Sequence, residues 1–168
     1  MPDQFEGRYS GQAPAGGRVL TDAEAGSACG PAAAVAFARA NGRNPTLREA
    51  VDLAASQVNR QQNYYWDAQG GMHGVGRFSE YLNAMGVPHQ LAAGAPDWNA
   101  VAQAANGGHL VAISTPNHYF VVQGYNAQTG QFYVGSSGTA MRGGAPWSTA
   151  QQLLALGGGT PDGVVYGR

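Results

Sequence analysis

The sequence predicts an α+β domain, with helices in its first part and antiparallel strands in its second. Before residue 108, apolar residues recur at the three-to-four-residue spacing of helices. Near residue 108 the spacing changes to about two residues, which is the period of a strand. A turn at residues 126–130 then joins two alternating segments, as expected for a hairpin.

Four helices are expected before this change of period. The first opens at residues 27–31 and runs to Ala40, with Pro31 in the first turn, where its missing N–H costs nothing. The second follows a capping box at residues 46–49. A third carries an apolar face over residues 78–85, and a short fourth helix follows Asp97, a typical N-cap residue.

Four strands and one more helix are expected afterwards. Residues 109–113, 118–125 and 131–134 alternate or are continuously apolar, and the last two segments flank the hairpin turn. Ser148 is expected to cap a short last helix. Residues 164–166 are expected to form an edge strand.

Composition and charge limit the function classes. The chain has 168 residues, of which 43% are hydrophobic, enough for the core of one domain. Residues 1–18 are interpreted as an N-terminal arm, and residues 19–168 as a single domain. A net charge of -1 gives no electrostatic basis for binding nucleic acid or an anionic membrane. We expect a monomer or a domain of a larger protein.

The cellular setting is less constrained by the sequence. Only 11% of the residues are charged, and Gly, Ala, Asn and Gln are abundant, which favours an extracytoplasmic or virion-associated protein. No signal peptide is visible in the first residues. No apolar stretch is long enough to span a bilayer.

Cys29 is the only cysteine, so the chain has no internal disulfide and no multi-cysteine zinc site. Such a residue is either a core filler or a reactive thiol. Its expected place at a helix N-terminus favours the thiolate, the nucleophilic form, and lowers the pKa of the thiol. The small neighbours Ala28 and Gly30 also make it a poor core filler. We therefore interpret Cys29 as a nucleophile.

A nucleophilic thiol needs a base, and the chain has four histidines. His118 starts the first strand of the predicted hairpin, and a rigid strand end is the best mount for a catalytic base. His73 lies in a glycine-rich loop, His109 begins another strand, and His89 lies at an expected surface strand start. His73 or His109 would replace His118 as the base if either lay nearer to Cys29.

Two motifs in this order resemble the papain-like superfamily. They are Cys-Gly-Pro-Ala-Ala from Cys29 and His-Tyr-Phe-Val-Val-Gln-Gly-Tyr from His118. More closely, they resemble the peptidases that remove double-glycine leaders from bacteriocins. The resemblance implies a papain-like fold with an N-terminal helical half packed on a C-terminal antiparallel sheet. It also implies a peptide or protein substrate, Cys29 as nucleophile and His118 as base, with no cofactor or metal.

Three further positions are judged against the same families. Gly70 and Gly71 resemble the loop whose backbone pairs with an extended substrate, a close approach that glycine permits. Ser136 stands where these families place the Asp or Asn that orients the histidine, and its hydroxyl adds no charge. The backbone N–H of Cys29 is expected to point toward the oxyanion formed on attack. Ala23 stands where these families have a Gln that also stabilises the oxyanion, so a second oxyanion donor is not identified.

Four readings of function therefore stay open. The first is a cysteine peptidase or isopeptidase, with glycine-rich peptides among its candidate substrates. The second is a cysteine–histidine amidase that cleaves peptidoglycan cross-links, which the near-neutral charge disfavours. The third is a catalytically impaired papain-like domain that binds peptide, and the fourth is a purely structural phage or secreted module.

Overall fold

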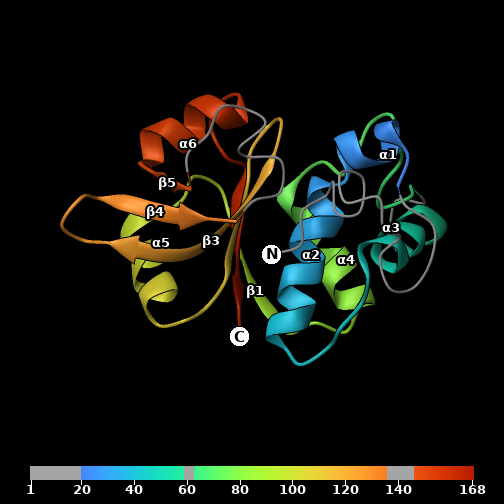
Figure 1. The fold of residues 1–168 in the computed structure, drawn as a ribbon, viewed down its shortest axis with the longest axis horizontal. Helices are drawn as coiled ribbons and strands as arrows, with labels where there is room; N and C mark the ends of the chain where they lie inside the picture. The colour runs from blue at the N-terminus through green and yellow to red at the C-terminus, as the bar shows by residue number, and fades with distance from the viewer. Residues whose placement is uncertain (1–19, 59–62, 136–145) are drawn as a thin grey trace.

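The computed structural model describes residues 20–58, 63–135 and 146–168 (Figure 1). The arm predicted at residues 1–18 lies outside these residues. Within the described part, six helices accompany one six-stranded sheet whose paired strands are all antiparallel, which confirms the predicted α+β class.

Local hydrogen bonds explain where several helices begin. The Thr46 and Asp97 side chains accept backbone N–H groups at the starts of α3 and α5, as the sequence predicts. The six helices are α1 (Asp22–Ser27), α2 (Cys29–Ala40), α3 (Leu47–Ser56), α4 (Val75–Ala84), α5 (Trp98–Asn106) and α6 (Ala150–Gly157).

Two helix starts differ from the sequence-based expectation. The short helix α1 was not expected, although Thr21 and Glu24 form a complete capping box at its start. The last helix, α6, is capped by Thr149 and not by Ser148. Thr149 is the N-cap because Gln152 completes its capping box. Ser148 instead pairs with Phe132 in the sheet.

The strand order in the sheet is β1-β6-β2-β3-β4-β5. The predicted hairpin is confirmed as β3 and β4. Strand β6 was expected at an edge, but it lies inside the sheet and pairs with both β1 and β2. The strands are β1 (His89–Ala93), β2 (Val111–Ser114), β3 (Tyr119–Asn126), β4 (Gln131–Val134), β5 (Trp147–Ser148) and β6 (Gly163–Gly167).

The sheet separates two hydrophobic clusters. Tyr119 and Val121 of β3 belong to the cluster formed with α1 to α4, whereas Phe120 and Val122 belong to the cluster formed with α5 and α6. Figure 1 shows the two helix groups on opposite sides of the molecule. Because successive strand residues face opposite sides and both sides are covered, the buried parts of β2 and β3, residues 111–113 and 119–122, are apolar without interruption.

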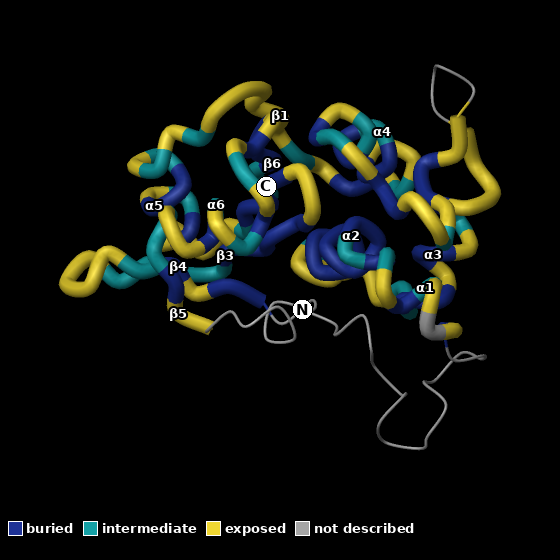
Figure 2. The backbone as a smooth tube through the Cα atoms, turned by 90° about the horizontal axis from the view of Figure 1, so that it is seen from above, coloured by how far each residue is buried: buried dark blue, intermediate teal, exposed yellow. Residues whose placement is uncertain are grey.

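Helix α2 is the centre of the helical half, and it is buried almost all round (Figure 2). Six of its 12 residues are alanines, whose small side chains let neighbouring elements approach closely. In the described part of the chain, no helix has the length and hydropathy needed to cross a membrane.

Candidate active site

Cys29 is the first residue of α2, as predicted. The N-cap residue Ala28 forms no side-chain cap, and the first helical hydrogen bond runs from Ala32 N to the Ala28 carbonyl at 2.9 Å. The first N–H groups of a helix have no partner within it and carry its positive dipole end. The thiol is half-buried at the margin of the helical cluster.

The glycine after the cysteine is required by packing. A Cβ at Gly30 would lie 2.9 Å from the Cβ of Met72, closer than real Cβ contacts. Met72 is buried and comes from the segment that precedes α4. Gly30 therefore allows that segment to pack against the first turn of the helix that carries Cys29.

His118 directly precedes β3, and it is held through its backbone. Thr115 donates both its N–H and its hydroxyl to the His118 carbonyl, at 2.9 and 2.7 Å. The imidazole packs edge-on against Phe120, with ring centroids 4.8 Å apart, and the residue is 2% exposed. The expected rigid strand-end mount is therefore present.

The end of α6 supports the segment that carries His118. Asn117 N donates to the Gly157 carbonyl at 3.0 Å. A Cβ at Gly157 would lie 2.6 Å from both the Cβ and the Cγ2 of Thr115, and one at Gly158 would collide with the Asn117 amide. Two glycines thus let α6 approach the 115–118 segment directly.

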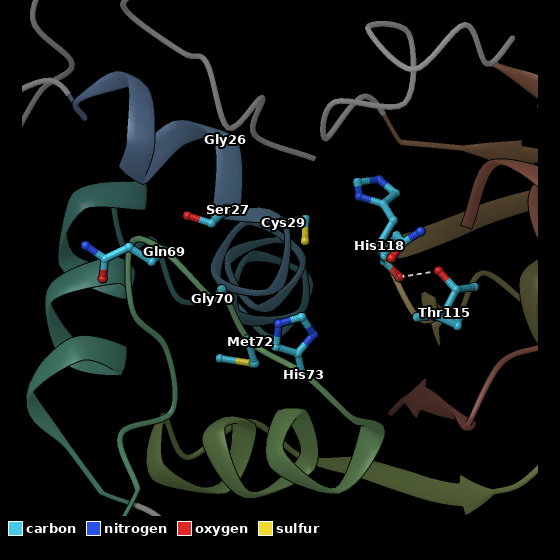
Figure 3. Close-up of a pocket in the computed structure, with 12 residues that line it drawn as sticks. Gly26, Ser27, Cys29, Gln69, Gly70, Met72, His73, Thr115 and His118 are labelled. Carbon is cyan, nitrogen blue, oxygen red and sulfur yellow. Dashed lines mark hydrogen bonds between the residues drawn. The ribbon is translucent and has the colours of Figure 1, made fainter. Parts of the chain in front are cut away.

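One cavity of about 180 Å³ connects the two halves of the molecule. Cys29 and His118 both line it, as do Gly70 and Gly71. In Figure 3 the Cys29 side chain projects from the start of α2 into the space between this helix and the His118 segment. The structure therefore brings together four of the five residues predicted from the sequence. The fifth, Ser136, lies outside the described residues.

The loop that carries Gly70 and Gly71 is held by internal hydrogen bonds and lies close to the end of α1. The Gly71 N–H donates to the Asp67 carbonyl at 2.8 Å, and its own carbonyl accepts the Asp67 N–H at 3.4 Å. The Gly70 N–H donates to the Asp67 carboxylate. Gly71 has a φ of 71°, and a Cβ there would lie 3.2 Å from the Ser27 carbonyl oxygen. Its role in substrate pairing stays a prediction, because these backbone groups already have partners.

The second oxyanion donor is not supplied by the expected position, since Ala23 lies in α1 without a polar side chain. Gln69 lines the cavity, but in Figure 3 its amide points away from Cys29. The backbone N–H of Cys29 stays the one donor that we assign.

The other histidines have different surroundings. His73 lines the same cavity as Cys29 and is exposed, so the choice of His118 over His73 as the base stays a prediction. His109 lines other cavities near the end of β6, so it is not a base for Cys29. His89 is held by Ser79 and the Val87 carbonyl, at 2.7 and 2.9 Å.

A buried tyrosine joins the two halves beside the cavity. The Tyr119 hydroxyl donates to the Gly74 carbonyl at 3.0 Å, linking the start of β3 to the start of α4. Burial raises the pKa of Tyr119 far above its ordinary value. The phenol therefore stays protonated as a hydrogen-bond donor.

Among the described residues, no group of three or more His, Cys, Asp or Glu side chains is arranged to hold a metal ion. No protein-family model, curated protein or solved structure matches this chain. The site is therefore defined by its geometry: a helix-start thiol and a strand-start imidazole on one cavity.

Proposed function

We propose that this protein is a cysteine peptidase of papain-like architecture, with Cys29 as nucleophile and His118 as general base and acid. The observation that carries the proposal is the single cavity that joins the thiol of the helical half to the imidazole of the sheet half. A thiol at a helix start and an imidazole at a strand start, both on one cavity, also agree with what the sequence resemblance implies.

The proposed reaction begins with transfer of the Cys29 proton to His118. The thiolate sulfur then bonds to the carbonyl carbon of the substrate, and the C=O electron pair moves to the oxygen. The backbone N–H of Cys29, at the positive end of α2, stabilises this oxyanion. As the oxyanion collapses, the C–N bond breaks, and the His118 imidazolium gives its proton to the leaving amine.

The resulting thioester is hydrolysed by the same two residues. A water molecule gives a proton to His118 while its oxygen bonds to the carbonyl carbon. The C–S bond breaks, the carboxylic acid leaves, and Cys29 returns as the thiolate paired with the His118 imidazolium. We assign no other described residue to proton transfer.

The same chemistry would cleave the amide cross-links of peptidoglycan, so the two substrate classes are distinguished by assay. A mass-spectrometric screen of a peptide library and of purified peptidoglycan should detect hydrolysis of peptides. Cys29→Ala and His118→Ala should each abolish it, whereas His109→Ala, outside the cavity, should leave it unchanged.

Three other results would contradict the proposal. Cleavage of peptidoglycan alone would identify the amidase. Retention of activity in Cys29→Ala would exclude a thiol mechanism. Peptide binding with no hydrolysis at all would identify the impaired domain, for which the absence of a polar side chain at Ala23 argues.

A further inference from the structure

His73 is presented to the cavity from a segment that is fixed on both sides. Met72, before it, is 3% exposed and packs against Gly30. The Gly74 carbonyl, after it, accepts the Tyr119 hydroxyl at 3.0 Å, and the Val75 N–H donates to the Asp162 carboxylate at 2.9 Å. The His73 side chain itself is exposed and lines the cavity. A fixed backbone with an exposed side chain is suited to contacting a ligand.

The charges around the cavity favour an anion at His73. None of the described residues that line the cavity is Asp, Glu, Lys or Arg, so its titratable side chains are those of Cys29, His118 and His73. His73 lies two residues before α4, whose N-cap Gly74 has no side-chain cap and whose first turn contains Arg77 but no acidic residue. The start of a helix and a nearby arginine both attract negative charge.

Two carboxylates lie near the start of α4 and the glycine loop, and each already accepts hydrogen bonds from backbone N–H groups. Asp162 accepts the Val75 N–H, and Asp67 accepts the N–H groups of Gln69 and Gly70. Neither of them lines the cavity. In Figure 3, His73 and His118 lie at different ends of the space beside Cys29, so a substrate bonded to the sulfur can reach His73 without displacing His118.

We propose that His73 is a specificity-determining residue that binds a carboxylate of the substrate within one or two residues of the scissile bond. The inference rests on the proposed peptidase function and names its substrate class as acidic peptides. A protonated imidazole and a carboxylate form a charge-assisted hydrogen bond, which is stronger than a neutral one.

The first test compares, at pH 6, peptides that differ only by Glu or Gln at each position near the cleaved bond. The wild type should cleave one Glu peptide with a kcat/KM about tenfold above that of its Gln partner. His73→Gln should abolish this preference, and His73→Glu should reverse it in favour of Lys. His109→Gln is the matched control and should keep it.

A second test needs no peptide substrate. Iodoacetate and iodoacetamide alkylate the same thiol, but only iodoacetate is charged. In His73→Gln, the ratio of the iodoacetate rate to the iodoacetamide rate at Cys29 should fall about threefold to tenfold. The iodoacetamide rate should change little, because the proposed base is His118.

Each outcome separates this inference from the proposed function. Peptide cleavage with equal rates on Glu and Gln peptides would overturn the role of His73 and leave the peptidase intact. If no peptide is cleaved, the proposed function fails, and an unchanged alkylation ratio in His73→Gln would overturn the inference as well. A ratio that falls equally in His109→Gln would show a general charge effect and would also overturn it.

Discussion

Replacing Gly157 with alanine should displace His118, although Gly157 lies at the end of α6 and does not line the cavity. The new Cβ would lie 2.6 Å from the Cβ and Cγ2 of Thr115. Carbon atoms in contact need about 3.5 Å, so Thr115 has to retreat by roughly 1 Å. Thr115 is buried and β-branched, so it cannot swing away by rotating a long side chain.

The retreat of Thr115 weakens the two hydrogen bonds that fix the His118 carbonyl, at 2.9 and 2.7 Å. Overpacking of this kind typically costs about 1–3 kcal/mol of the free energy of unfolding. A displacement of about 1 Å in a catalytic group can lower a rate about 100-fold. We therefore expect Gly157→Ala to slow His118-dependent alkylation of Cys29 by about 10- to 100-fold.

The measurement combines urea unfolding with alkylation by iodoacetamide at pH 6. Gly76→Ala is the matched control, because a Cβ at Gly76 in α4 meets nothing within 4 Å. That variant should be as stable as the wild type or more so, since alanine is the better helix former. If Gly157→Ala matched Gly76→Ala in both assays, the proposed support of His118 by α6 would be refuted.

Two further predictions concern the helical half. Gly30→Ala places a Cβ 2.9 Å from the Cβ of Met72, so its free energy of unfolding should fall by about 1–3 kcal/mol, as measured by urea titration. Burial opposes ionisation of Glu24, but the Thr21 N–H and the Arg48 guanidinium outweigh it and lower the pKa of Glu24 below its usual 4.5. The charged form is thus favoured by folding, so this stabilisation is present above pH 4.5 and is lost as the pH falls through the lowered pKa. Glu24→Gln should accordingly be less stable than the wild type at pH 7, as measured by thermal unfolding. The difference in stability should shrink at acidic pH. A difference that does not depend on pH would contradict the ion pair between Glu24 and Arg48.

The parts of the fold that could be predicted from sequence are those encoded by neighbouring residues. The capping box at Thr46 and the N-cap at Asp97 are hydrogen bonds within a few residues of chain. The Cys29 helix start and the hairpin of β3 and β4 are similarly local. Such signals fix where an element begins without reference to the rest of the molecule.

The pairing of strands in the sheet was harder to predict, because it depends on residues that are far apart in the chain. Strand β6 pairs with β1 and β2, and no local pattern specifies those partners. One signal was present: Val164 and Val165 are adjacent and both buried, one in each hydrophobic cluster. Consecutive apolar residues are typical of a strand that is covered on both faces.

In the candidate site, too, features encoded by local sequence could be predicted, whereas contacts between distant segments could not. The residue types at Cys29 and His118 pointed to their proposed chemistry, and the structure places both on one cavity. The contact of Gly157 with Thr115, and the presence of His73 on that cavity, depend on how distant segments pack. Helical or strand periodicity carries no information about such contacts.

The central claim is that His118 activates the thiol of Cys29, and alkylation by iodoacetamide tests it directly. Because Cys29 is the only cysteine, the total rate of alkylation reports on this residue alone. Below its pKa of about 8.5, an unactivated thiol reacts about tenfold faster for each unit by which the pH is raised, because its thiolate fraction grows in proportion. We predict a wild-type rate that is fast and nearly constant from pH 6 to pH 8, and a His118→Ala rate that is slow at pH 6 and rises steeply. A steep rise in the wild type, or identical profiles for the two proteins, would contradict the account.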